Sequence, residues 1–283
     1  MYNNIEKEKI KLLATDLDGT LLREDKTISE DDSETLRRLG RKGIVRVAAT
    51  GRSLHKVRDV LHANSPFDFV IFSSGAGIYN WKEKQLIHSE KFENEITFEI
   101  CKHLLKSNFN FFIYKPIPHN NLFWFHKGAG ECHEFDSYLQ RHSGDFTEFN
   151  LSNFSGEAGQ VMAVIPNNDV LINRLTVNIY KACKNVRVIR TTSPVNTEFT
   201  WLEIFPDTVS KGHGLEWLCN YLKIERADTA GIGNDYNDIE MFEFVKYPFL
   251  MKNGAKQLKE TVLTIEASNQ ENGLSQAVDL LGL

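Results

Sequence analysis

The sequence predicts an α/β protein: a doubly wound, mostly parallel sheet with a second α/β domain inserted into it. Short apolar segments end in small polar residues at four places, and helical patterns separate the early ones. This alternation of strand and helix implies right-handed crossovers and a parallel sheet. It stops after Tyr79, where an aromatic-rich segment with several consecutive strands follows.

The first predicted strand is the most informative element. Its apolar run, which begins at Leu12, leads into Asp16-Leu17-Asp18-Gly19-Thr20. Such a strand places Asp16 at the carboxyl edge of the sheet, where open α/β folds have their sites. A carboxylate there can attack phosphorus and form an aspartyl-phosphate. Attack on a phosphate dianion requires a cation, and Mg²⁺ suits oxygen ligands and phosphates.

Asp18 follows two residues later and can protonate the leaving oxygen and then activate water. We expect the negative charge of its neighbour to raise the pKa of Asp18, which would help an acid. Gly19 permits a tight turn, and Thr20 can cap or orient it. The alternative interpretation is a solvated acidic turn after a buried strand.

The next elements continue the alternation. Ser29 to Asp32 resembles a capping box, and the pattern through Leu36 and Leu39 predicts a helix that stops near Gly43. The following segments are strand 44–49 ending in Thr50-Gly51-Arg52, helix 53–62, and strand 69–72 ending in Ser73-Ser74-Gly75.

The segment from 84 to 205 is predicted to form the inserted domain, and residues 1–83 and 206–283 the core domain. Within the insertion we expect a helix from Asn94, a plausible N-cap, to Lys106. The expected strands are 109–114, 122–125, 186–189 and 200–204. The aromatic residues of 109–125 are interpreted as core rather than as the lining of a ligand pocket.

The chain then returns to the core. Ser210-Lys211-Gly212 begins a helix with Leu215, Leu218 and Leu222. A helix start favours anions and Lys211 would strengthen such a site, although the helix dipole opposes a lysine there. Strand 229–232 ends in Gly233-Asn234-Asp235-Tyr236-Asn237-Asp238, which supplies several oxygen ligands. Alone, these segments could be a solvated lysine and an Asx-rich turn; together with Asp16 and Asp18 they favour a metal site.

Composition and charge indicate which partners and which cellular compartment to expect. The 283 residues carry a net charge of −5, so no basic field supports nucleic-acid binding. No apolar run reaches membrane-spanning length and the polar start is no secretory signal, so we expect a cytoplasmic protein without membrane partners. The four cysteines are scattered, which predicts reduced structural thiols. Cys132-His133, with His126 nearby, gives only a weak hint of a soft metal site.

In these motifs and their order the chain resembles the haloacid dehalogenase-like phosphatases, and within them the Cof-type sugar-phosphate phosphatases. The resemblance covers nearly all of the chain. It implies a Rossmann-like core with a large α/β cap, inserted between the second and third motifs. It also implies roles for the motif residues. Asp16 is nucleophile and metal ligand. Asp18 is the acid/base and ligates through its backbone carbonyl. Thr50 and Lys211 hold the phosphoryl oxygens, and Gly51 and Arg52 belong to the same substrate-binding motif as Thr50. Asn237 touches the phosphate. Asp238 supports the metal through water or orients Lys211.

The chain departs from the family pattern at three places. Gly233-Asn234 stands where Gly-Asp is usual, with Asp235 one place later, so either Asn234 or Asp235 is the expected metal ligand. The other departures, Ser74-Gly75-Ala76 and Asn253-Gly254-Ala255, concern peripheral contacts.

The expected function is a Mg²⁺-dependent phosphomonoesterase that acts on small phosphorylated metabolites, with sugar phosphates as the expected class. The expected partner is a small-molecule phosphate ester, and the oligomeric state, monomer or weak dimer, is open. The alternatives are a phosphosugar mutase, which shares these motifs, and a non-catalytic phosphometabolite sensor, motivated by Asn234. The identity of the substrate depends on the geometry of the cap.

Overall fold

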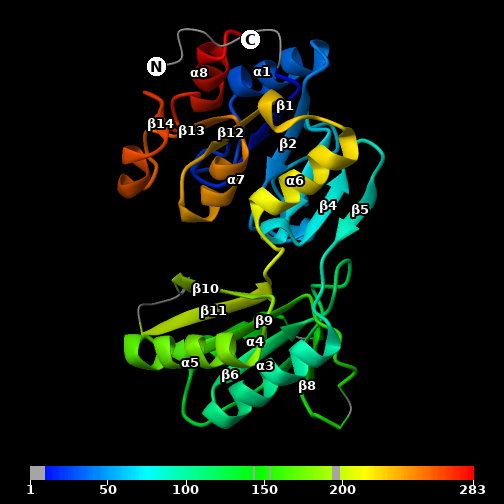
Figure 1. The fold of residues 1–283 in the computed structure, drawn as a ribbon, viewed down its shortest axis with the longest axis vertical. Coiled ribbons are helices and arrows are strands. Elements are labelled where there is room, and N and C mark those ends of the chain that lie inside the picture. The colour runs from blue at the N-terminus through cyan, green and yellow to red at the C-terminus, as the bar shows by residue number, and fades with distance from the viewer. Residues whose placement is uncertain (1–9, 143, 153, 193–197) are drawn as a thin grey trace. The chain divides into compact units, whose positions relative to one another are not determined.

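The computed structural model describes residues 10–142, 144–152, 154–192 and 198–283. The chain divides into two compact units (Figure 1). The first consists of the chain up to His88 together with Ser210–Leu283, and the second is Ser89–Val209. Each unit has a sheet of its own, of eight and six strands respectively.

The sheet of the first unit has the order β14-β13-β12-β1-β2-β3-β4-β5. Every neighbouring pair from β14 to β3 is parallel, and β4 runs antiparallel to β3. Its strands are β1 Leu12–Thr15, β2 Val45–Ala49, β3 Phe69–Phe72, β4 Gly77–Asn80, β5 Gln85–Ser89, β12 Thr229–Gly233, β13 Tyr247–Leu250 and β14 Leu263–Thr264. The predicted doubly wound, mostly parallel sheet is therefore confirmed.

Helices α1 Glu30–Arg41, α2 Leu54–Arg58, α6 Lys211–Leu222, α7 Ile239–Phe244 and α8 Gly273–Leu280 belong to this unit. Ser29 caps α1 as predicted, because its hydroxyl accepts a hydrogen bond from the Asp32 amide at 3.1 Å. The prediction of a helix to His62 was wrong, since α2 ends at Arg58. Beyond Arg58 the chain continues as a turn, in which the amides of Val60 and Leu61 both bond to the Val57 carbonyl.

The second unit is a mixed α/β layer. Its sheet has the order β10-β11-β9-β6-β7-β8, antiparallel except for the pair β7 and β8. The strands are β6 Asn110–Tyr114, β7 Phe123–His126, β8 Phe146–Glu148, β9 Gln160–Pro166, β10 Val186–Thr192 and β11 Phe199–Pro206. Helices α3 Asn94–Ser107 and α5 Asp169–Ala182 pack together against the sheet, and α4 His133–Arg141 contributes Phe135 to a separate apolar cluster.

The start of α3 differs from the expectation, whereas the aromatic residues of 109–125 agree with it. Asn94 is the first residue of α3 rather than its N-cap, because Glu93 takes that position and Nδ2 of the Asn94 side chain donates to the Ser155 carbonyl instead. The aromatic residues are core, as interpreted: Phe111, Phe112 and Phe123 are buried in ring contacts with their neighbours.

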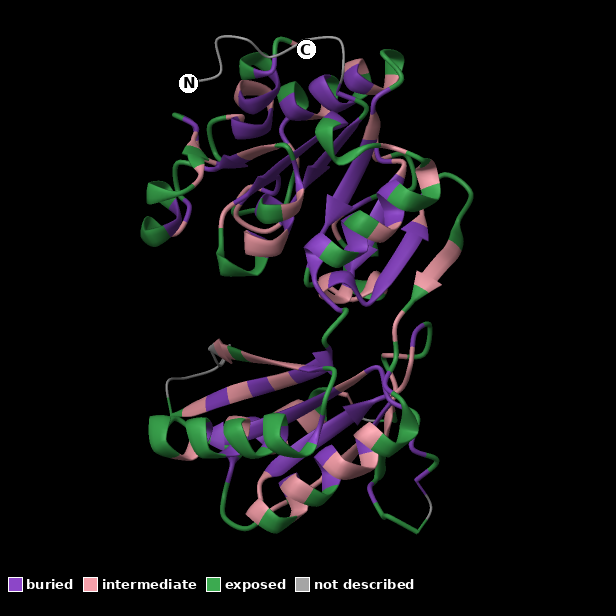
Figure 2. Ribbon diagram, in the orientation of Figure 1, coloured by how far each residue is buried: buried purple, intermediate pink, exposed green. Residues whose placement is uncertain are grey.

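Burial follows the sheets in both units (Figure 2). Strands β1 and β3 are buried at every position, which matches their continuous apolar runs. Cys101, Cys132, Cys183 and Cys219 are free thiols, and each is buried. Across the described ranges, every helix is too short or too polar to span a membrane.

A largely buried ion pair joins β2 to Asp68, the residue before β3. Arg46 donates to both carboxylate oxygens of Asp68, at 2.8 and 2.9 Å, and the Arg46 amide donates to the same group. Lys82 adds a second cation at 2.5 Å. Partial burial opposes ionisation of Asp68, but these hydrogen bonds outweigh it and hold the pKa of Asp68 below its usual value.

Asp68→Asn is expected to lower the free energy of unfolding by about 3 kcal/mol at neutral pH, because it removes one partner of a buried pair. A carboxyl with a depressed pKa stabilises the fold above its unfolded pKa, about 3.9, and this stabilisation is lost as the pH falls through the folded pKa. Urea titrations of both proteins should therefore converge in acid. Asp59→Asn, in an exposed pair with Lys56, is the control and should cost less than about 1 kcal/mol. A deficit that persisted unchanged at low pH would contradict this account.

Candidate active site

The polar residues that follow four parallel strands lie at one edge of the first unit's sheet. β1 lies between β12 and β2, with Thr15 in register with Ile232 and Ala48, and β3 lies beside β2. Asp16, Thr50, Ser73 and Asn234 are the residues that directly follow these strands. The predicted convergence of the motifs on the carboxyl edge is what the topology of parallel strands produces.

Lys211 lies at the centre of this edge. Its Nζ donates to Asp16 Oδ1 at 2.7 Å and to Asp238 Oδ1 at 2.6 Å. The side chains of Lys211 and Asp238 are 1% and 0% exposed, and that of Asp16 is 6% exposed. Three segments that are distant in the sequence are thereby joined by one buried ammonium group.

Burial and the charges of this cluster shift the pKa values of Asp16 and Lys211. Burial raises the pKa of Asp16 to about 7; Lys211 opposes this rise and the charge of Asp238 adds to it. Burial disfavours the charged form of Lys211, but the two carboxylates outweigh it and raise the pKa of Lys211 above its usual value. Lys211 is therefore a permanent cation, and one positive charge faces two carboxylates.

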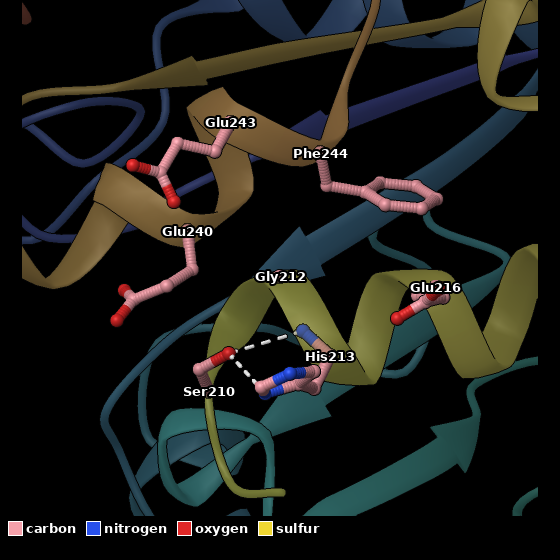
Figure 3. A pocket seen from close by; sticks show the side chains of 7 residues that line it. All are labelled: Ser210, Gly212, His213, Glu216, Glu240, Glu243 and Phe244. Atoms are coloured by element: carbon pink, nitrogen blue, oxygen red, sulfur yellow. Dashed lines mark hydrogen bonds between the residues drawn. The ribbon is translucent and has the colours of Figure 1, made fainter.

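The start of α6 explains how a lysine is held here. Ser210 caps the helix: its hydroxyl accepts from the His213 amide and also bonds to His213 Nδ1, both at 3.0 Å (Figure 3). A Cβ on Gly212 would lie 2.4 Å from the Glu240 carbonyl, so the glycine lets α7 approach α6. A cavity of about 210 Å³ lies beside this turn, and Lys211 does not line it. Figure 3 shows Glu240 and Glu243 on α7 beside it.

The loop after β12 folds around the Asp238 carboxylate. Asp238 Oδ2 accepts from the amides of Asn234 and Asp235, at 2.8 and 3.1 Å, while Oδ1 accepts from Lys211. Asp235 is exposed and its Oδ1 accepts from the Tyr236 amide, which caps the 3₁₀ turn Tyr236–Asp238. Asn237 is exposed on this turn, and its side chain makes no hydrogen bond to the described residues. Asp238 is thus the part of this motif that contacts Lys211.

The side chain of Asn234 reaches the first motif. Its Oδ1 accepts from the Thr20 hydroxyl at 3.1 Å. The same terminal atom lies 3.2 Å from Asp16 Oδ2 and 3.1 Å from the Asp18 carbonyl, and with the amide reversed the nitrogen would donate to all three. Gly19 permits this approach, because a Cβ there would lie 2.4 Å from Asn234 Nδ2 and its φ is +76°.

These oxygens fit a divalent cation. The hydrogen bonds of the Asn234 amide are satisfied with its nitrogen facing these atoms; with Oδ1 facing them instead, the orientation that a cation would require, a carboxylate oxygen, a backbone carbonyl and an amide oxygen come together. Neighbouring ligands of octahedral Mg²⁺ lie about 2.9 Å apart at a metal distance of ~2.05 Å, close to the spacing here. Acidic, histidine and cysteine side chains alone form no such group of three in the described part of the chain. The donor set therefore depends on Asn234 and the Asp18 carbonyl.

Asp18 is held by cations. Arg52 donates to both of its oxygens, through Nε at 2.5 Å and Nη2 at 2.7 Å, and Lys26 Nζ lies 3.0 Å from Oδ1. Partial burial favours the neutral acid, but these bonds outweigh it and lower the pKa of Asp18. The expectation of a raised pKa was wrong, because two cations contact the carboxyl group and dominate over the neighbouring negative charge.

Two further contacts at this site were not predicted. Lys26 lies in a polar turn without a motif, so only its position after the first motif could have suggested it. Asn253 donates to the Gly19 carbonyl at 2.8 Å, and so holds the turn between Asp18 and Thr20. Thr50 is buried and its hydroxyl accepts from the Arg52 amide at 3.2 Å, whereas Gly51 is exposed.

The fold and this acid cluster define a doubly wound α/β protein with a candidate active site at the carboxyl edge of its parallel sheet. Residues 13–278 match the haloacid dehalogenase-like hydrolase family. The chain belongs to this family, and within it to the Cof-type phosphatases with a large α/β cap.

Relatives and solved structures match over the whole length. The 5-amino-6-(5-phospho-D-ribitylamino)uracil phosphatase YwtE of Bacillus subtilis is 25% identical over 287 residues, covering 96% of this chain and 98% of that protein. The phosphatase BT1666 of Bacteroides thetaiotaomicron has a TM-score of 0.77 at 17% identity, covering 100% and 99% of the two chains. The subclass IIB sugar phosphatase BT4131 has a TM-score of 0.69 at 17% identity, covering 96% and 99%. The chain is therefore a phosphatase, an enzyme that acts on phosphorylated substrates.

Lys211→Met is expected to lower the free energy of unfolding, measured without added metal, by about 3–5 kcal/mol at neutral pH, since it leaves buried carboxylates without their cation. Without the opposing charge of Lys211, the pKa of Asp16 rises further in the folded variant, so the fold binds protons more strongly than the unfolded chain. The deficit should be largest at about pH 8 and shrink toward about pH 5. Lys56→Met, at an exposed position, is the control. A deficit of the same size at both pH values would assign the loss to packing.

Proposed function

We propose that this phosphatase is a Mg²⁺-dependent phosphomonoesterase that hydrolyses small phosphorylated metabolites, with sugar phosphates as the class, through an aspartyl-phosphate. The observation that carries the proposal is the buried Asp16 carboxylate held by Lys211, with the Asp18 carboxyl two residues further along the same edge. A carboxylate in this position can act as a nucleophile, and a second one nearby can transfer the proton.

In the first half of the reaction, an oxygen of Asp16 forms a bond to phosphorus as the bond to the leaving oxygen breaks. Asp18 donates its proton to that leaving oxygen, which departs as an alcohol. In the second half, Asp18 takes a proton from water, the water oxygen bonds to phosphorus, and the Asp16–phosphorus bond breaks. Inorganic phosphate and free Asp16 result.

Arg52 has to release Asp18 for this cycle to operate. In the resting geometry Arg52 and Lys26 stabilise the ionised form of Asp18, which cannot donate a proton. A bound phosphate group offers Arg52 another anion of matching geometry. Arg52 would then contribute to substrate binding together with Thr50 and Gly51, and Asp18 would regain its proton.

The cation would be held by Asp16 Oδ2, the Asp18 carbonyl and Asn234, and when bound it supplies positive charge to the phosphoryl oxygens. Because one ammonium group faces two carboxylates, a further positive charge is electrostatically favourable here. Asp238 orients Lys211 and fixes the loop that presents Asn234. Asp235, which caps the 3₁₀ turn, is proposed to contribute only its charge, and Asn237 to touch the bound phosphate.

The substrate class is inferred from the relatives. YwtE is named for a phosphoribityl substrate and BT4131 for sugar phosphates. We propose that the inserted domain, residues 84–205, is the cap that selects among such substrates. The test is a screen of inorganic phosphate release across phosphorylated metabolites at saturating Mg²⁺. Release from sugar phosphates is expected; an isomerised sugar phosphate would indicate a mutase, and binding without turnover a sensor.

Asp16→Asn is expected to abolish phosphate release while the circular dichroism spectrum is unchanged, because the amide is nearly isosteric but cannot form the acyl phosphate. Asp18→Asn should lower kcat about 10²–10⁴-fold through loss of proton transfer. Asp25→Asn is the matched control and should keep full activity, because among the described residues the Asp25 carboxylate accepts hydrogen bonds from Thr27, two residues further along the chain. Near-wild-type turnover by Asp16→Asn would rule out this mechanism.

Asn234→Asp is expected to lower the Mg²⁺ concentration for half-maximal rate, because a carboxylate adds negative charge to the donor set. Asn234→Ala should raise that concentration, since one oxygen ligand is lost. Both are measured by Mg²⁺ titration of the rate with one substrate. Asp235→Asn, which keeps the cap of the turn, is the matched comparison and should have the smaller effect. A severe effect of Asp235→Asn with no effect of Asn234→Ala would make Asp235 the ligand instead.

A further inference from the structure

A second cavity lies at the other edge of the first unit's sheet. Its volume is about 330 Å³, within the range of small-molecule pockets. The turn after α2 lines one side and the chain from β4 into the following turn lines the other. Asn80, at the end of β4, pairs with Phe69 at the start of β3, and the Trp81 amide bonds to the Asp68 carbonyl. The cavity therefore lies toward the amino edge of β3, whereas the acid cluster follows the carboxyl ends of the strands.

The wall of this cavity is aromatic. Tyr79 and Trp81, at i and i+2 of one extended segment, lie edge to face with ring centroids 6.1 Å apart. Both are more than nine-tenths buried, and the Trp81 indole nitrogen has no hydrogen-bond partner among the described residues. Leu61 adds an apolar surface. A flat apolar group would match this wall.

Two cations line the same cavity without a carboxylate partner in the described part of the chain, Arg58 and Lys84. The Arg58 guanidinium lies 5.6 Å from the centre of the Tyr79 ring and bonds to the Tyr79 hydroxyl at a long 3.4 Å. Nearby lysines are paired: Lys56 with Asp59 and Lys82 with Asp68. The positive charge of Arg58 and Lys84 is thus unbalanced, in a chain whose net charge is −5.

From these observations we propose that the cavity is a second binding site, which takes a planar aromatic ligand carrying a carboxylate or phosphate group. The ring packs on the apolar wall that Leu61, Tyr79 and Trp81 line, and the anion bonds to Arg58 and Lys84. A guanidinium fork matches either anion in a bidentate way, and its position over Tyr79 already orients it. Because the acid cluster lies at the opposite edge of the strands, this ligand and a phosphate at Asp16 can bind together.

The test is calorimetric titration of the full chain with 2-naphthoate, in excess inorganic phosphate. The expected result is saturable binding of one naphthoate, with no binding of the neutral 2-naphthylmethanol. Arg58→Ala should weaken binding at least ~10-fold, the loss of a charge-assisted bond. Lys84→Asn should act in the same direction, and asparagine tolerates the left-handed backbone of that position, φ +56°. A parallel titration with 2-naphthylphosphonate, whose carbon–phosphorus bond is not a phosphoester, shows which anion is preferred.

Lys56→Ala removes a cation from α2 outside the cavity and should leave the naphthoate affinity unchanged. Asp16→Asn should also bind naphthoate like the wild type, so this test is independent of the proposed hydrolysis. The proposal is overturned if neither naphthyl anion binds, or if both cavity variants bind as the wild type does.

Discussion

The contact of Lys211 with Asp16 and Asp238 is the constraint on which the site depends. A lysine in the first turn of a helix is disfavoured by the dipole, and a buried ammonium by desolvation. Both costs are offset only if the strand end before Asp16 and the loop ending in Asp238 hold their carboxylates within hydrogen-bond distance. The order of β12, β1 and β2 in the sheet, the Ser210 cap and the close approach at Gly212 all serve this geometry.

In this arrangement one ammonium group faces two carboxylates, so the cluster of Lys211, Asp16 and Asp238 carries excess negative charge when both are ionised. Burial raises the pKa of Asp16 to about 7, and the charge of Asp238 adds to this rise while Lys211 opposes it. In the proposed mechanism Asp16 is the nucleophile, and a carboxyl group that is half protonated near neutrality is a poor one, so that mechanism calls for more positive charge beside Asp16 Oδ2. The oxygens of Asn234 and Asp18 are the groups placed to hold it. The asparagine supplies an oxygen without adding a third negative charge to the cluster.

The sequence was most informative where short-range patterns set the structure. The apolar runs before Asp16 and Asn234 predicted parallel strands, and the Ser29 cap and the α6 start followed from local residue types. It was least informative where a long side chain chooses among partners. The pairing of Arg52 and Lys26 with Asp18 depends on which cations the fold brings within reach, and it reversed the expected direction of the pKa shift. The end of α2 was also missed, since beyond Arg58 the chain continues as a turn.

The two edges of the first unit's sheet carry opposite charge imbalances. At the carboxyl edge, carboxylates outnumber the buried ammonium, which favours a cation and, with it, a phosphoryl group. At the amino edge of β3, the carboxylate of Asp68 is saturated by Arg46 and Lys82, and Arg58 and Lys84 remain unneutralised beside aromatic rings. Exposed pairs contribute little to stability, so such unpaired cations cost the fold little. They are therefore available for ligand binding, and the same part of the sheet that positions the proposed nucleophile Asp16 at one edge can hold an aromatic anion at the other.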